Sequence, residues 1–190
     1  MKHDMPVMKS LAKRFRQEED GVVTVSFVLV FPVFMFFFYA TYETGMVNLR
    51  HVMLERGVDL AVREVRIGSM NNPTADRLRE RICDIAGVIP DCENQLRVEM
   101  LRRDLRAAWV PISSAAQCVN RAEPVQLPEE FNTFGDNELM FLRVCARIDP
   151  VLPGARLGRK IKEIDSSAAA GGSFALISSA AFVVEPFQGI

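Results

Sequence analysis

The chain has 190 residues, with 23 Lys and Arg against 24 Asp and Glu, and its formal net charge is −1. This balance leaves no overall basic field of the kind that proteins use to bind nucleic acid, so we expect no nucleic-acid partner. The length is sufficient for a tail, an anchor and one globular domain of roughly 150 residues.

An uncharged apolar stretch of 19 residues, 22–40, follows a short polar start. As a helix it would span roughly 29 Å, about the thickness of the hydrocarbon core of a bilayer. A buried helix of a soluble protein is the alternative, but this stretch is apolar around its whole circumference. We therefore predict a transmembrane helix at 22–40.

The charges on the two sides of this stretch differ. Only Arg50 and Arg56 are basic between Thr41 and Leu60. Five basic residues precede it: Lys2, Lys9, Lys13, Arg14 and Arg16. The positive-inside bias then predicts a single-pass membrane protein, with residues 1–21 as a cytoplasmic tail and everything after Ala40 exported. A cleavable signal peptide is less consistent with the sequence, because Phe38 stands where the cleavage site needs a small residue.

Residues 41–72 are predicted to extend the anchor as a helix, since no Pro occurs between Pro32 and Pro73. Two apolar series recur every seven residues: Met46, Met53, Leu60 and Ile67, and Val47, Leu54, Ala61 and Gly68. They form an apolar stripe on one side of the helix. The stripe could associate with a second copy or pack on the chain's own domain.

Residues 73–190 are predicted to form an exported α+β domain. Asn72-Pro73 has the composition of a helix start, which indicates a helix at about 73–86. Period-two alternation predicts half-buried strands at 96–100, 140–148 and 174–184, with a bulge at Ser178-Ser179 in the last. The expected fold is a long N-terminal helix and a second helix against an antiparallel sheet of at least three strands.

Four cysteines, Cys83, Cys92, Cys118 and Cys145, all follow the apolar stretch. Exported cysteines in even number predict disulfides. The Cys83–Cys92 pair is favoured because the two flank one short turn, and Cys118–Cys145 follows by elimination, although four cysteines allow three connectivities. The second bridge would hold the irregular segment 104–137 to the middle strand.

The N-terminal sequence resembles TadE-like proteins, the minor pilin-like components of Tad (tight adherence, Flp-type) pilus systems. The resemblance covers about residues 13–50 and depends on Arg14-Phe15-Arg16, Glu18-Glu19-Asp20, Gly21, the apolar helix with Pro32, and Glu43-x-Gly45. It implies a pilin-like fold, a pseudopilin role in pilus assembly, and other pilus-assembly proteins as partners. It also implies an anchor in the inner membrane and a C-terminal domain in the periplasm. It also implies prepilin peptidase cleavage between Gly21 and Val22.

One position departs from the pilin pattern. Pilin-like proteins usually carry Glu at the fifth position after the cut, followed by an aromatic residue, and here these positions are Ser26 and Phe27. The Glu of pilins is thought to pair with the N-terminal amine of a neighbouring subunit, which Ser26 cannot neutralise. Cleavage and no cleavage therefore both stay open, and the sequence favours a pilus tip or inner-membrane position over the repeating shaft.

Nothing in the sequence favours catalysis or a cofactor. The chain lacks the G-x-S-x-G, Walker and H-E-x-x-H patterns, and its cysteine spacings fit no zinc site. We expect no enzyme activity, no cofactor and no metal, and we attribute Glu129-Glu130 to solvation. The alternative function is a membrane-tethered periplasmic binding module for an envelope partner or ligand.

Two further expectations concern single features. Trp109 is expected to close the edge of the core, with ligand stacking as the alternative. The basic cluster of residues 156–162 is expected to be a solvated face, with contact to acidic lipid headgroups or a partner as the alternative.

Overall fold

A computed structural model describes residues 20–70, 72–104, 113, 116–123, 125–126, 128–132, 137–152, 154, 157–160 and 172–185, without the side chains of 20–22. The chain forms two compact units, Met1–Tyr42 and Glu43–Ile190. The predicted roles of Trp109, Arg156 and Lys162 fall outside the described residues. Arg159 and Lys160 lie exposed in one helical turn at 157–160.

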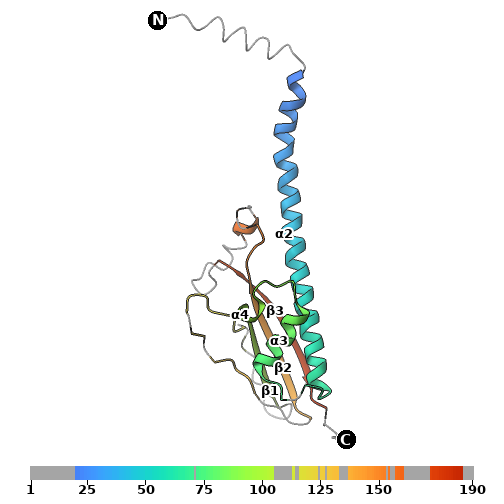
Figure 1. The fold of residues 1–190 in the computed structure, drawn as a ribbon, viewed down its shortest axis with the longest axis vertical. Coiled ribbons are helices and arrows are strands. Elements are labelled where there is room, and N and C mark those ends of the chain that lie inside the picture. Colours follow the sequence, from blue (N-terminus) through green and yellow to red (C-terminus); the bar gives the residue numbers. More distant parts are fainter. Residues whose placement is uncertain are drawn as a thin grey trace, which may run out of the picture. The chain divides into compact units, whose positions relative to one another are not determined.

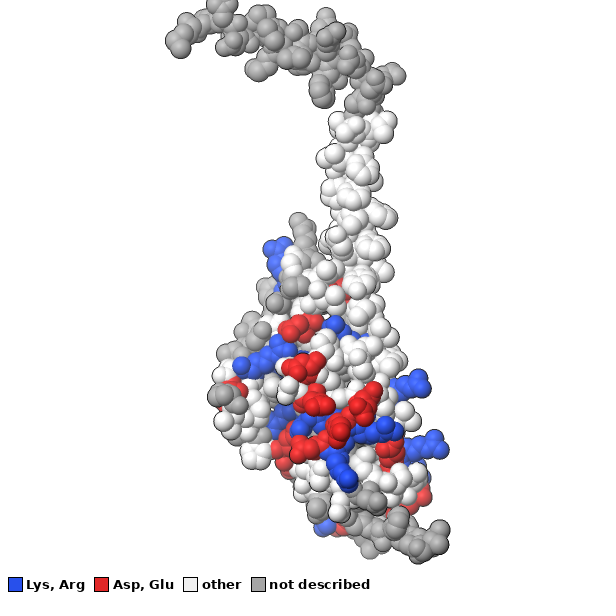
Figure 2. Space-filling view, viewed as in Figure 1, with Lys and Arg blue, Asp and Glu red and all other residues white. Residues whose placement is uncertain are grey.

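Helix α2, Asp20–Arg66, is continuous through Pro32 and runs through both units (Figure 1). Its part in the first unit exposes large apolar side chains on every side, including Val23, Leu29, Phe34 and Phe38. This stretch is long and apolar enough to cross a membrane. Figure 2 shows the described surface of the first unit without charge, whereas charged side chains of both signs gather on the second unit.

The second unit is built on a three-stranded antiparallel sheet in the order β1-β2-β3. The strands are β1 (Leu96–Arg103), β2 (Leu139–Ile148) and β3 (Phe174–Val183). The two helices after α2 are α3 (Ala75–Ile85) and the short α4 (Cys92–Gln95), which directly precedes β1. The predicted α+β class, with a second helix and three antiparallel strands, is therefore confirmed.

The core lies between one face of the sheet and helices α2 and α3. The sheet contributes Val98, Met100, Leu142 and Val144, all fully buried. The part of α2 in this unit contributes Leu54, Val58, Ala61 and Val65, and α3 contributes Leu78 and Ile82. The predicted stripe is thus half correct, because the series with Leu54 and Ala61 packs on the domain while Leu60 and Ile67 of the other series stay exposed.

Helices α2 and α3 approach each other at Gly57. A Cβ added to Gly57 would lie 2.9 Å from the carbonyl oxygen of Ile82, closer than real Cβ atoms come to backbone oxygen. Only a glycine therefore fits at this crossing without a shift of one helix. Gly45, earlier in the same helix, has open space around its Cα.

The opposite face of the sheet is covered as well, so the expectation of half-buried strands was wrong for β1 and β2. Arg97, Glu99 and Arg143 point to this face and are all at least 90% buried. Glu99 accepts a hydrogen bond from Nε of Arg143, its cross-strand partner, at 2.5 Å, and another from the backbone N–H of Gln117 at 3.1 Å. Arg143 also donates to the carbonyl of Ser113 at 2.6 Å. Ser113 and Gln117 of the long loop therefore cover a buried ion pair and supply hydrogen bonds to both of its members.

Two local predictions were also wrong. The side chain of Thr74, not Asn72, caps α3 and accepts a hydrogen bond from the N–H of Arg77, while Asn72 has a left-handed backbone with φ of 49°. Pro73 therefore lies before the cap and outside α3, because the hydroxyl of Thr74 supplies the capping hydrogen bond. The bulge at Ser178-Ser179 is absent from β3, whose ten residues pair one to one with β2.

Candidate functional site

The predicted processing junction lies at the start of α2. Gly21 and Val22 are helical, and Ser26 and Phe27 follow one turn later with exposed side chains. The ring of Phe27 stacks on Phe31 with centroids 4.9 Å apart. Exposed apolar residues surround the Ser26 hydroxyl, so a charge placed beside it in a bilayer would find no carboxylate from this part of the chain.

A buried carboxylate marks the first residue of the second unit. Glu43 has no exposed surface. Its two carboxylate oxygens accept hydrogen bonds from the backbone N–H groups of Val151 and Leu152 at 2.9 and 2.8 Å. Charge-assisted bonds of this kind are about twice as strong as neutral ones, so Glu43 fixes the segment after β2 to α2.

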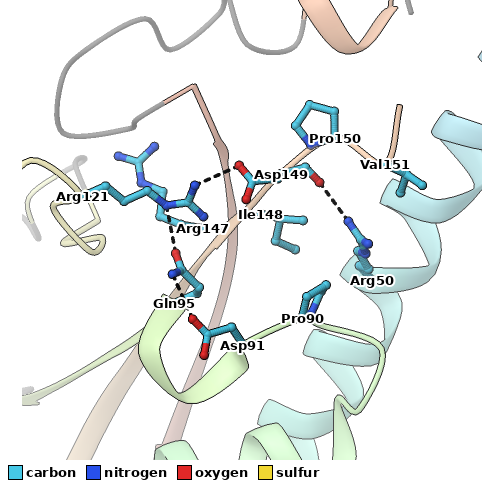
Figure 3. A pocket seen from close by; sticks show the side chains of 10 residues that line it. All are labelled: Arg50, Pro90, Asp91, Gln95, Arg121, Arg147, Ile148, Asp149, Pro150 and Val151. Atoms are coloured by element: carbon cyan, nitrogen blue, oxygen red, sulfur yellow. Dashed lines mark hydrogen bonds and ion pairs between the residues drawn. The ribbon is translucent and has the colours of Figure 1, made fainter. Parts of the chain in front are cut away.

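Two turns further along α2, Arg50 lines a cleft of about 420 Å³ (Figure 3). The charged and polar lining residues are Arg50, Asp91, Gln95, Arg121, Arg147 and Asp149, and the apolar ones are Pro90, Ile148, Pro150 and Val151. The lining thus comes from α2, from α4 and the turn before it, from the long loop, and from the end of β2 and the residues after it. A volume of this size is typical of small-ligand sites.

Arg50 and Arg121 are the two arginines of the cleft that lie outside the sheet, and Arg50 is the more deeply buried of them. Only 7% of its surface is exposed, and one terminal nitrogen donates to the backbone carbonyl of Asp149 at 3.1 Å. Its Nε is buried and has no hydrogen-bond partner among the described residues. Arg121, by contrast, pairs with the Asp149 carboxylate at 2.9 Å and donates to Gln95 at 3.0 Å.

Both predicted disulfides are present. Cys83–Cys92 links α3 to α4, and Cys118–Cys145 links the long loop to the middle strand. The second bridge holds the same segment that covers Glu99 and Arg143. Residues 116–119, which form neither helix nor strand, are thereby held beside these charged side chains.

Glu129 is a structural residue, so the expectation of simple solvation was wrong for it. Its carboxylate bonds to Arg79 of α3 at 2.5 Å and lies 4.0 Å from Arg97 of β1. Partial burial lowers the pKa of Arg79, but the carboxylates of Glu129 and Asp76 outweigh this effect and raise the pKa above its ordinary value. Arg79 therefore stays charged and holds the loop at the edge of the sheet.

Sequence reasoning missed the pair of polar residues Glu43 and Arg50. Glu43 was noted only as part of the Glu43-x-Gly45 motif. The two residues are seven positions apart, on the helix face that also carries Leu54 and Ala61. This heptad spacing could have indicated that they face the domain. The cleft itself had no signal, because its residues come from four distant parts of the sequence.

Comparison with known proteins adds one match. Residues 21–63 match the family model of TadE-like protein. The TadE-like segment covers most of α2, including Glu43 and Arg50, and ends before α3. It therefore points to a Tad pilus-associated component, in agreement with the resemblance noted at the N-terminus. No curated protein and no solved structure matched the chain.

Proposed function

We propose that this chain is a minor pilin-like subunit of a Tad-type pilus, anchored in the inner membrane by α2 with its second unit in the periplasm. The main support for this proposal is that the TadE-like segment coincides with the one described helix that is long and apolar enough to cross a membrane. Its role is structural, through helix–helix contacts and contacts of the domain with other pilus-assembly proteins.

The absence of a carboxylate at Ser26 supports a position outside the repeating shaft. An amine released at Val22 would need a partner in the apolar environment, and burying an unpaired charge costs several kcal/mol. Ser26 offers only a hydroxyl to the next subunit. At a pilus tip or in an inner-membrane platform, Ser26 would not have to pair with the N-terminal amine of a further subunit.

Deletion of the gene, combined with quantification of purified pili, tests this proposal. We expect loss of pili on deletion, rescue by the intact chain, and far fewer copies of this chain than of the main subunit in wild-type pili. Mass spectrometry of the mature N-terminus then separates processing, which leaves Val22 first, from a permanent anchor. Normal pili in the deletion strain would contradict the proposal.

A membrane-tethered binding module is the second candidate, and the cleft beside Arg50 favours it. In that case the periplasmic unit would capture a ligand or envelope partner, and α2 would serve only as the tether. Pilus formation would then persist without the chain, which distinguishes this candidate from the first.

A further inference from the structure

We propose that the cleft lined by Arg50, Arg121 and Arg147 binds a monocarboxylate with an apolar body. This inference goes beyond the pilus role and does not depend on it. It rests on the volume of the cleft, the charges of its lining and the buried state of Arg50.

The net charge of the lining selects a single negative charge. Three guanidinium groups face two carboxylates, Asp91 and Asp149, which leaves one positive charge. Both carboxylates already have partners, since Asp91 accepts bonds from Asn94 and Gln95 and Asp149 pairs with Arg121. A ligand with one negative charge would neutralise the lining, whereas a phosphate dianion would leave it with a net negative charge.

Arg50 identifies where the negative group would bind. A guanidinium that is more than nine-tenths buried loses most of its hydration, and no carboxylate lies within 4 Å of it among the described residues. Glu43 is about 10 Å away along the helix axis and has both oxygens bonded to backbone N–H groups. The planar donor fork of Arg matches a carboxylate, and the free Nε offers one side of that fork.

The remaining walls indicate the rest of the ligand. Pro90, Ile148, Pro150 and Val151 line the cleft beside the arginines. Figure 3 shows Pro90 and Ile148 between Arg50 and the Arg121 side of the cleft. An apolar side chain attached to the carboxylate would bury its surface there, which is the common pattern of ligand sites. A free acid and the C-terminal residue of a peptide share this chemistry.

Calorimetric titration of the full chain in a non-ionic detergent tests the proposal. We use N-acetyl-leucine as the probe and N-acetyl-leucinamide as its uncharged match, with leucine and inorganic phosphate as charge controls. The acid is expected to bind with a dissociation constant below ~1 mM, and each of the other three at least ~10-fold more weakly. N-acetyl-Ala-Ala-Leu distinguishes a peptide C-terminus from a free acid as the ligand. If this peptide binds more tightly than N-acetyl-leucine, the ligand is a chain terminus. If it binds equally or more weakly, the ligand is a free acid.

Variants locate the site. Arg50→Gln is expected to weaken binding of the acid at least ~10-fold, while Arg56→Gln, exposed on the same helix, leaves it unchanged. Arg121→Gln, at the rim, gives a second measurement that does not alter the buried part of α2. Circular dichroism checks that each variant is folded. Equal binding of the amide or of phosphate, no heat with the acid at ~10 mM, or unchanged binding by folded Arg50→Gln and Arg121→Gln would each overturn the proposal.

Discussion

The carboxylate of Glu43 accepts a hydrogen bond from the backbone N–H of Val151, 108 residues later in the chain. Replacement of Glu43 by Ala removes this bond and the one from Leu152, and it leaves two N–H groups without partners. We expect the free energy of unfolding to fall by about 3–5 kcal/mol, as for other buried charged groups. Urea unfolding in detergent, followed by circular dichroism, measures the change.

Glu55→Ala is the matched control for this prediction. Glu55 lies on the same helix with about half of its side chain exposed, 3.7 Å from His51. Its removal should change the free energy of unfolding by less than about 0.5 kcal/mol. Equal effects of the two substitutions would show that Glu43 does not anchor the segment after β2.

The crossing of α2 and α3 predicts opposite effects for two similar substitutions. Gly57→Ala should destabilise the fold by about 1–3 kcal/mol, because the new methyl group meets the carbonyl of Ile82. Gly45→Ala should stabilise it by up to about 1 kcal/mol, because Ala is the better helix former and nothing lies within 4 Å. Thermal unfolding of both variants checks this, and a rise in both midpoints would contradict the close crossing.

The two disulfides should contribute unequally. Cys118–Cys145 closes a loop with a sequence separation of 27, and Cys83–Cys92 one with a separation of 9. On loop entropy, removal of the first by paired Ala substitutions should cost about 3.5 kcal/mol and removal of the second about 2.6 kcal/mol. Denaturant titration measures both, and non-reducing peptide mapping checks the pairing. Free thiols at all four positions in the wild-type chain would be incompatible with it.

The orientation in the membrane can be measured with a reporter that is active only outside the cytoplasm. Fusion after Gly68 should give an active reporter, and fusion before Gly21 an inactive one. The reason is the excess of basic residues before the apolar stretch. Activity of the early fusion alone would reverse the orientation.

Ser26→Glu tests the proposed position in the pilus. If Gly21–Val22 is cleaved, the new carboxylate can pair with the amine of a neighbouring subunit, so we expect more copies of the chain per purified pilus. Ser26→Ala should leave the copy number low. Quantitative mass spectrometry measures both, and an unchanged number for Ser26→Glu in a chain that begins at Val22 would refute the stacking argument.

Sequence pattern was sufficient where one physical preference dominated. Alternation placed β2 within one residue of Leu139–Ile148, since Met140, Leu142 and Val144 share the core face. The uncharged run predicted the apolar part of α2, and the short turn between Cys83 and Cys92 predicted their bridge.

Sequence pattern did not predict the burial of a side chain where that burial depends on residues distant in the sequence. Glu99 and Arg143 look like solvent-facing residues, but a loop covers them and each neutralises the other. Arg50 is comparable, since its burial depends on the chain around Asp149, about 100 residues later. No local preference encodes such pairings, so the cleft could be found only in three dimensions.

The contact between α2 and the end of β3 has a consequence for the order of folding. The carbonyl of Arg66 accepts a hydrogen bond from the N–H of Glu185, and their side chains form an ion pair at 2.8 Å. The ribosome makes Arg66 well over a hundred residues before Glu185, so α2 must wait for the last strand to complete the sheet beside it. Contacts this far apart in sequence slow folding. The end of α2 therefore gains this contact with the sheet only when synthesis is almost complete, whereas its contact with α3 at Gly57 can form much earlier.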